Sequence, residues 1–259
     1  MFERFREKRR LARAPMPAEW IGYIAASVAQ WKYLDDDERR QILDDVRMLL
    51  GSKTWEAARG FELTDEIKVT IAAQASLLVL GFDDLNPYRG VSAIIVHPTT
   101  VYLEGQHAGH VPGTMTDEPM SLLGLAEFDG PIIIAWDEVR RNARHPEHGH
   151  NVVYHEFAHK LDMLDGVIDG RPPLGRGDAV ARWAAVCNEE YEKVRAGLGG
   201  HLIDDYAATD PAEFFAVVTE VFFDIPVEME AEKPELYDVL RDFYQQDPAA
   251  RVRKGARLI

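Results

Sequence analysis

The chain has 259 residues, 46% of them hydrophobic, and a formal net charge of −15 at pH 7; its length allows a substantial core, and its acidity disfavours nonspecific binding to nucleic acid. One cysteine, Cys187, excludes an internal disulfide framework, and the sequence shows neither an apolar run of transmembrane length nor an apolar secretory signal near its beginning. We therefore expect a single cytoplasmic domain over residues 1–259, with no membrane partner and no direct nucleic-acid partner.

The first 60 residues predict a helical N-terminal part. Apolar residues recur at helical spacing over Ala18–Tyr33 and Asp36–Leu50. A third helix is expected to begin after the capping residue Thr64, at the start of the segment 61–250 that we expect to form the catalytic core. Helices therefore come before any strand in this chain.

Positive charge is concentrated at the two ends. Residues 1–13 and the tail 251–259 each carry a net charge of +4, although the whole chain is strongly acidic. Basic ends of this kind are either solvated arms or segments that fold back on the acidic body.

Short β-rich runs follow the first helices. They cover Ser92–Val96, Val101–Glu104 and Pro131–Trp136, and glycine and proline turns separate them. The last run is a candidate sheet edge along which an extended peptide lies, although its three consecutive isoleucines also suit an interior strand buried on both faces. Helices return from residue 151, so the pattern predicts an α+β fold with a small mixed sheet.

Residues 155–159 carry the pattern His-Glu-x-x-His, the most informative feature of the chain. Residues four apart lie on the same face of a helix, so the rings of His155 and His159 can reach one zinc ion, with Glu156 as general base. Asp162, one turn after His159, is either a group that supports a ligand or a solvated helix residue. The pattern predicts a zinc-dependent peptidase site.

The flanking residues predict that this pattern lies on a helix. Asn151 is a suitable N-cap. Val153, Phe157, Leu161 and Leu164 recur at helical spacing and form an apolar stripe. The two histidines fall on the opposite side of the helix and therefore face away from the core.

A catalytic zinc site needs a third protein ligand. His145, His148 and His150 lie just upstream, in a stretch with proline and glycine that we interpret as a polar loop rather than as a source of ligands. His107 and His110 likewise lack a regular element that would fix their geometry. The third ligand is therefore sought downstream.

The segment around residue 210 contains residues that are typical of the start of a helix. Asp210 is the expected N-cap and Pro211 the first helical residue. Glu213 and Glu220, seven residues apart, share one face of this helix. Glu213 also stands where a glutamate reaches back to the helix start in a capping box, so the residues alone leave open whether it binds metal.

Three segments resemble the Mlc titration factor A family of zinc-dependent peptidases: 151–163, 206–216 and 243–248. The resemblance covers roughly residues 60 to 248. It implies a zincin-like domain of the gluzincin type, with an active-site helix and a downstream ligand helix. Ala212 precedes Glu213 where thermolysin-like gluzincins have asparagine, so the supporting groups of that branch are not carried over.

Residue roles follow from the same resemblance. It implies that His155, His159 and Glu213 bind Zn²⁺, that Glu156 is the catalytic base, and that Tyr206 assists as a phenol. In this mechanism Glu156 takes a proton from water and can return it to the leaving amine, while zinc and Tyr206 share the oxyanion.

Three functions are compatible with the sequence. The first is a zinc peptidase, which the resemblance narrows to an aminopeptidase on short peptides. The second is a regulatory protein, because the family name records the capture of Mlc, a glucose-responsive transcription repressor; a Mlc-like repressor is then a partner. The third is a zinc amidase that acts on a non-peptide amide.

Overall fold

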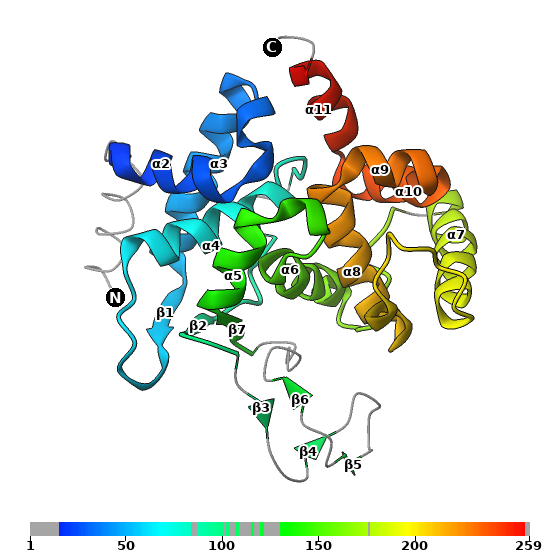
Figure 1. Cartoon of the computed structure of the whole chain (residues 1–259), viewed down its shortest axis with the longest axis horizontal. Helices are drawn as coiled ribbons and strands as arrows, with labels where there is room; N and C mark the ends of the chain where they lie inside the picture. The colour runs from blue at the N-terminus through cyan, green and yellow to red at the C-terminus, as the bar shows by residue number, and fades with distance from the viewer. Residues whose placement is uncertain are drawn as a thin grey trace.

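The computed structural model describes residues 16–83, 87–100, 130–175 and 177–256, together with four two-residue strands between positions 101 and 129. The fold is mostly helical, with a small sheet beneath the helices in the view of Figure 1. Residues 1–15, which include the basic N-terminal segment, lie outside the described residues. None of the described helices is long and apolar enough to span a membrane.

The N-terminal part consists of α2 (Ala18–Ser27), the 3-10 helix η1 (Ala29–Tyr33) and α3 (Asp36–Ser52). The prediction of one continuous helix over residues 18–33 is wrong, because Val28 is extended (φ −109°, ψ 101°). This break lets Val28 enter the core and lets the Gln30 side chain donate to the carbonyl of Phe223, 2.6 Å away. A tertiary contact therefore overrides the local helical pattern.

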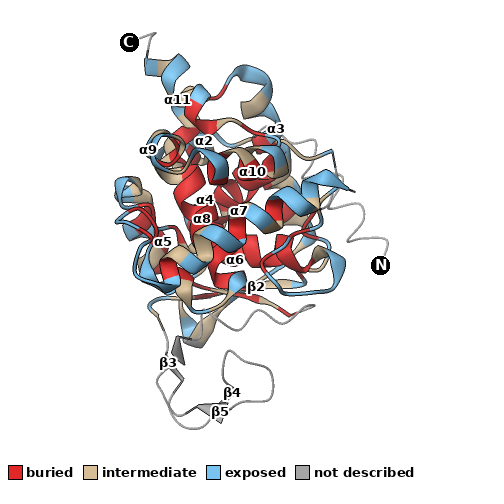
Figure 2. Cartoon of the chain, turned by 90° about the vertical axis from the view of Figure 1, so that its right-hand side faces the viewer, coloured by how far each residue is buried: buried red, intermediate tan, exposed pale blue. Residues whose placement is uncertain are grey.

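Helix α4 (Asp65–Leu78) runs through the middle of the molecule, and 11 of its 14 residues are buried. Thr64 caps it by accepting from the amide of Ile67, as the sequence predicted. Burial on all sides is typical of a helix in the interior, and the buried Gln74 side chain donates to the carbonyl of Ser27, 2.8 Å away. Figure 2 shows buried residues concentrated on α4 and on the central helices beside it.

Three strands form a parallel sheet in the order β1 (Thr54–Ala57), β2 (Ala93–His97), β7 (Ile132–Ala135). The sequence predicted a mixed sheet, whereas the three-stranded sheet formed by these described strands is entirely parallel. The sequence did not predict β1, whose side chains alternate between exposed and half-buried. Within the described part of the chain β7 pairs only with β2, which leaves it at one side of the sheet.

Four two-residue strands form two separate antiparallel pairs. They are β3 (Tyr102–Leu103) with β6 (Met120–Ser121), and β4 (His107–Ala108) with β5 (Met115–Thr116). The run predicted over residues 101–104 thus contains only β3 among the residues that the structure describes.

Short 3-10 segments and helices make up the rest of the described chain. They are η2 (Ala58–Gly60), α5 (Trp136–Arg144), η4 (Pro146–His148), α6 (Val152–Asp162), η5 (Met163–Asp165), α7 (Asp178–Arg195), η6 (Asp205–Ala208), α8 (Pro211–Asp224), α9 (Pro226–Glu232), α10 (Pro234–Tyr244) and α11 (Pro248–Ala256). Helices α6 and α8 pack against each other near the centre of the molecule (Figure 1).

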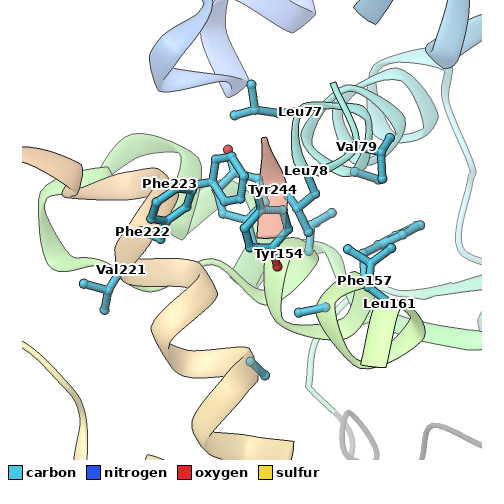
Figure 3. Packing of buried hydrophobic residues seen from close by; sticks show 14 of the residues in the cluster. Leu77, Leu78, Val79, Tyr154, Phe157, Leu161, Val221, Phe222, Phe223 and Tyr244 are labelled. Carbon is cyan, nitrogen blue, oxygen red and sulfur yellow. The ribbon is translucent and has the colours of Figure 1, made fainter. Parts of the chain in front are cut away.

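The core joins α4, α6 and α8 with the end of α10. Figure 3 shows Leu78 of α4, Tyr154 of α6 and Phe222 of α8 gathered near Tyr244. Tyr244 stacks on Phe222 at 5.5 Å between ring centroids, and its hydroxyl lies 2.8 Å from that of Thr219 on α8. Each fully buried large side chain contributes about 1.5–3 kcal/mol. This packing fixes the position of α6 relative to α8.

The start of the basic tail folds back on the N-terminal helices. Arg251 donates to Glu38 (2.7 Å) and to the side chain of Gln30 (2.8 Å). Of the two interpretations left open for the basic ends, folding back on the body describes this residue, whereas residues 257–259 lie outside the described part of the chain.

Candidate metal centre

Helix α6 carries the His-Glu-x-x-His pattern, as the sequence predicted. The side chain of Asn151 accepts from the amides of Val153 (3.1 Å) and Tyr154 (3.2 Å), so it caps the helix. Val153 and Phe157 are fully buried in the core, as is Leu161 further along the predicted apolar stripe. The opposite side of α6 therefore faces α8 and a cleft.

Helix α8 supplies the carboxylate. Asp210 caps this helix by accepting from the amides of Ala212 and Glu213, and Pro211 is its first residue. The carboxylate of Glu213 reaches α6, where its Oε2 lies 2.9 Å from Nε2 of His155. The same oxygen lies 3.6 Å from Nε2 of His159. The carboxylate thus meets the histidines, which is not where a capping box would place it.

The three ligand atoms fit one metal ion. The two Nε2 atoms are 3.2 Å apart, so the three separations are 3.2, 2.9 and 3.6 Å. Zinc bonds of about 2.0–2.2 Å in tetrahedral geometry hold ligand atoms roughly 3.3 Å apart. Oε2 of Glu213 is buried and has no hydrogen-bond partner among the described residues. Such an orphaned oxygen costs free energy unless a cation satisfies it.

Glu220 orients His155. Its Oε1 lies 2.7 Å from Nδ1 of His155, and its Oε2 accepts from the amide of Asn151. An ionised carboxylate only accepts, so Nδ1 donates and the lone pair of Nε2 is directed at the ligand cluster. Burial by itself lowers the pKa of His155, but Glu213 and Glu220 together raise it well above its usual value, so a metal ion binds here in exchange for the Nε2 proton. The role of Glu220 was left open by the sequence, although its spacing from Glu213 placed both on one face.

Glu156 lies beside the cluster of His155, His159 and Glu213, and one of its carboxyl oxygens makes no hydrogen bond to the described residues. Its side chain is buried, and Oε1 has no hydrogen-bond partner among the residues described. Burial is the main cause that raises its pKa, to about 8, with a smaller opposing effect from His155. A carboxyl group of this kind exchanges protons near neutral pH, as a general base requires.

Tyr206 lies across the cleft on η6. It is 44% exposed, and its ring centroid lies 6.1 Å from that of His155. Partial burial, followed by the nearby carboxylates of Glu213 and Glu156, raises the pKa of this phenol. Tyr206 therefore keeps its proton and can donate a hydrogen bond.

A cleft of about 420 Å³ opens onto these residues. Its walls include His155, Glu156, Tyr206 and Glu220, and also His145, His148 and His150, which come from the stretch interpreted as a polar loop. Part of that stretch forms the 3-10 helix η4. It begins just after the last residue of α5, at the cleft wall. His110 lies outside the described residues. For His107 the structure describes the backbone, which belongs to β4, and not the side chain.

Asp162 does not join the ligand cluster. It is fully buried, and its Oδ2 accepts from the amide of Gly170, 2.9 Å away. Gly170 has φ +71°, and a Cβ on it would lie 2.0 Å from the carbonyl oxygen of Pro211 at the start of α8. Asp162 therefore ties the segment after α6 to the beginning of α8.

The helix-borne histidine pair and the carboxylate from a second helix define a candidate metal-dependent hydrolase, and sequence comparison assigns the family. Residues 2–245 match the family described as glucose-regulated metallo-peptidase M90. The chain belongs to this family of metallopeptidases.

Relatives cover nearly the whole chain. It is 34% identical to an uncharacterized protein of Synechocystis over 94% of this chain and 89% of the relative. It is 32% identical to Mlc titration factor A of Serratia proteamaculans, over 89% of this chain and 92% of the relative. It is 30% identical to the protein of that name from Klebsiella pneumoniae, over 93% of this chain and 90% of the relative. The resemblance stated from the three sequence segments is confirmed.

Proposed function

We propose that the protein is a zinc-dependent peptidase in which His155, His159 and Glu213 hold the ion. The observation that carries this proposal is the convergence of three ligand atoms within 4.8 Å of one another, one of them a buried carboxylate oxygen without a hydrogen-bond partner among the described residues, next to the similarly unpartnered Oε1 of Glu156. Zinc, when bound, supplies a Lewis acid that polarises a carbonyl group and acidifies water. In this proposal α6 and α8 are the active-site helix and ligand helix of a zincin-like domain.

Three side chains divide the remaining chemistry. Glu156 accepts the proton of the attacking water and delivers it to the leaving amine. The protonated phenol of Tyr206 donates to the oxyanion that develops on the scissile carbonyl. Glu220 holds the ring of His155 in the tautomer that binds metal, because its carboxylate accepts from Nδ1.

Replacement of Glu156 tests the proposal. Glu156→Gln keeps the shape of the side chain but removes the base, so we expect turnover of short peptides to fall by at least 10²-fold while zinc content stays at one ion per chain. A chelator should abolish activity in the wild type, and added zinc should restore it. Unchanged hydrolysis by the variant or by the metal-free protein would refute the peptidase.

We further propose that the substrate class is short peptides with a free amino terminus. The strongly acidic chain, with a net charge of −15, favours a cationic ammonium group near the cleft. Acetylation of a peptide's amino terminus should therefore suppress its cleavage. Equal cleavage of blocked and free peptides would identify an endopeptidase instead.

Capture of a transcription repressor is a second candidate function, because relatives over most of the chain carry the name Mlc titration factor A. A cytoplasmic location fits both functions. We expect a Mlc-like repressor to bind a surface outside the zinc cleft, so Glu156→Gln should still retain it in a pull-down. Loss of retention by folded, zinc-loaded Glu156→Gln would mean that binding and catalysis share the cleft.

A further inference from the structure

A second group of metal-binding side chains lies at the end of α5, apart from the proposed catalytic ligands. His145, Glu147 and His148 each offer one ligand atom, and these atoms lie within 4.8 Å of one another. Oε1 of Glu147 is 3.0 Å from Nδ1 of His145 and 3.9 Å from Nε2 of His148. The three side chains are 52–64% exposed, so an ion from solvent reaches them directly.

The backbone that carries these side chains is anchored at both ends. The amide of His145 donates to the carbonyls of Arg141 and Asn142, which continues the last turn of α5. At the other end Gly149 has φ +67°, and a Cβ on it would lie 3.0 Å from the side chain of Ile225. A fixed turn lowers the entropy that the ligands lose on binding.

The chemistry of the group favours zinc over calcium or magnesium. Two imidazoles and one carboxylate are zinc ligands, whereas the hard cations prefer oxygen alone. The rings of His145 and His148 are stacked 5.3 Å apart, so small rotations of these exposed side chains bring both nitrogens toward Oε1 of Glu147. Arg141 lies on the same wall, but its guanidinium pairs with Glu138, which compensates its charge.

We propose that His145, Glu147 and His148 form a second zinc site on the wall of the catalytic cleft, weaker than the buried site. It is weaker because its ligands are exposed and give up more freedom on binding. His145 and His148 line the same 420 Å³ cleft as His155 and Glu156. An ion held there obstructs the cleft, so excess zinc inhibits the enzyme; this consequence rests on the proposed peptidase function, and the description of the site as the second one rests on the zinc site proposed above.

Calorimetric titration of zinc into protein that already holds one equivalent tests the site without any need for activity. The wild type should bind a second ion, and His145→Ala/His148→Ala should weaken this second step at least tenfold while it keeps the first ion. His201→Ala is the matched control, because His201 is 85% exposed and lies 3.6 Å from Glu232, outside the cleft lining. It should titrate like the wild type.

Two results would overturn the second site. One is a wild type that binds a single ion up to millimolar zinc; the other is a second step that survives in the double variant with unchanged affinity. Retention of the first ion and an unchanged circular dichroism spectrum show that the variant is folded. In peptide hydrolysis, excess zinc should inhibit the wild type and His201→Ala but spare the double variant, and equal inhibition of all three would overturn the inhibitory role.

Discussion

Two glutamates on α8 contact the same histidine from different sides. Oε2 of Glu213 faces Nε2 of His155 within the ligand cluster, whereas Oε1 of Glu220 faces Nδ1. The first position provides a ligand and the second fixes the tautomer and orientation of the ring. Two turns of α8 thus separate the glutamate that offers a metal ligand from the glutamate that orients the ring of His155.

Substitution of each glutamate distinguishes these roles. Glu213→Ala removes a ligand, so we expect the purified variant to contain no zinc after dialysis. Glu220→Ala leaves three ligands, so zinc should remain bound with an affinity lowered by about 10- to 100-fold. Zinc content by atomic absorption and competition with a chelator measure both effects. Full zinc occupancy in folded Glu213→Ala would contradict the ligand assignment.

Asp162 should make stability depend on pH. Burial, the largest cause, raises its pKa from 3.8 to about 7 in the folded protein. The folded state therefore holds this proton more tightly than the unfolded state. The stability from this group is fully present below about pH 4 and is lost as the pH rises toward 7, at about 1.4 kcal/mol per unit of pKa difference.

Asp162→Asn removes this titration and keeps an acceptor for the amide of Gly170. We expect the free energy of unfolding of the variant, relative to the wild type, to rise between pH 4 and pH 7. Urea denaturation at a series of pH values measures it. A constant difference across that range would show that Asp162 titrates normally.

Helix capping couples the stability of α6 to the metal site. The side chain of Asn151 accepts from two amides at the start of α6, and its backbone N–H donates to the carboxylate of Glu220. The N-cap therefore sets both the register of the histidines and the position of the group that orients His155. The same cap connects the two helices that carry the site.

Asn151→Ala should lower stability by about 1 kcal/mol and should also weaken zinc binding. Asp35→Ala is the matched control, because Asp35 caps α3 in a capping box remote from the cleft lining. Its stability loss should be similar, with zinc affinity unchanged. Denaturation and zinc competition on both variants check this. Equal zinc affinities in the two variants would mean that the cap does not position the ligands.

For the whole molecule, local patterns predicted the site better than the sheet. The caps Thr64, Asn151 and Asp210 act on neighbouring amides, so sequence alone located the starts of α4, α6 and α8. Strand β1 and the break at Val28 depend on partners far along the chain, which no local pattern encodes.

The site likewise depends partly on local patterns and partly on contacts between distant segments. Spacing placed both histidines on one face of α6, but the meeting of Glu213 with them depends on how α6 packs on α8. Resemblance, rather than spacing, favoured Glu213 over Glu220. The approach of His145 and His148 to the cleft depends on where α5 ends, so their sequence signal was only that of a polar loop.

Anomalous diffraction at the zinc edge, on crystals of the wild type with one equivalent of zinc, tests the central claim most directly. We predict one strong peak about 2.0–2.2 Å from Nε2 of His155, Nε2 of His159 and a carboxylate oxygen of Glu213. A strong peak elsewhere, or none between α6 and α8, would contradict the account.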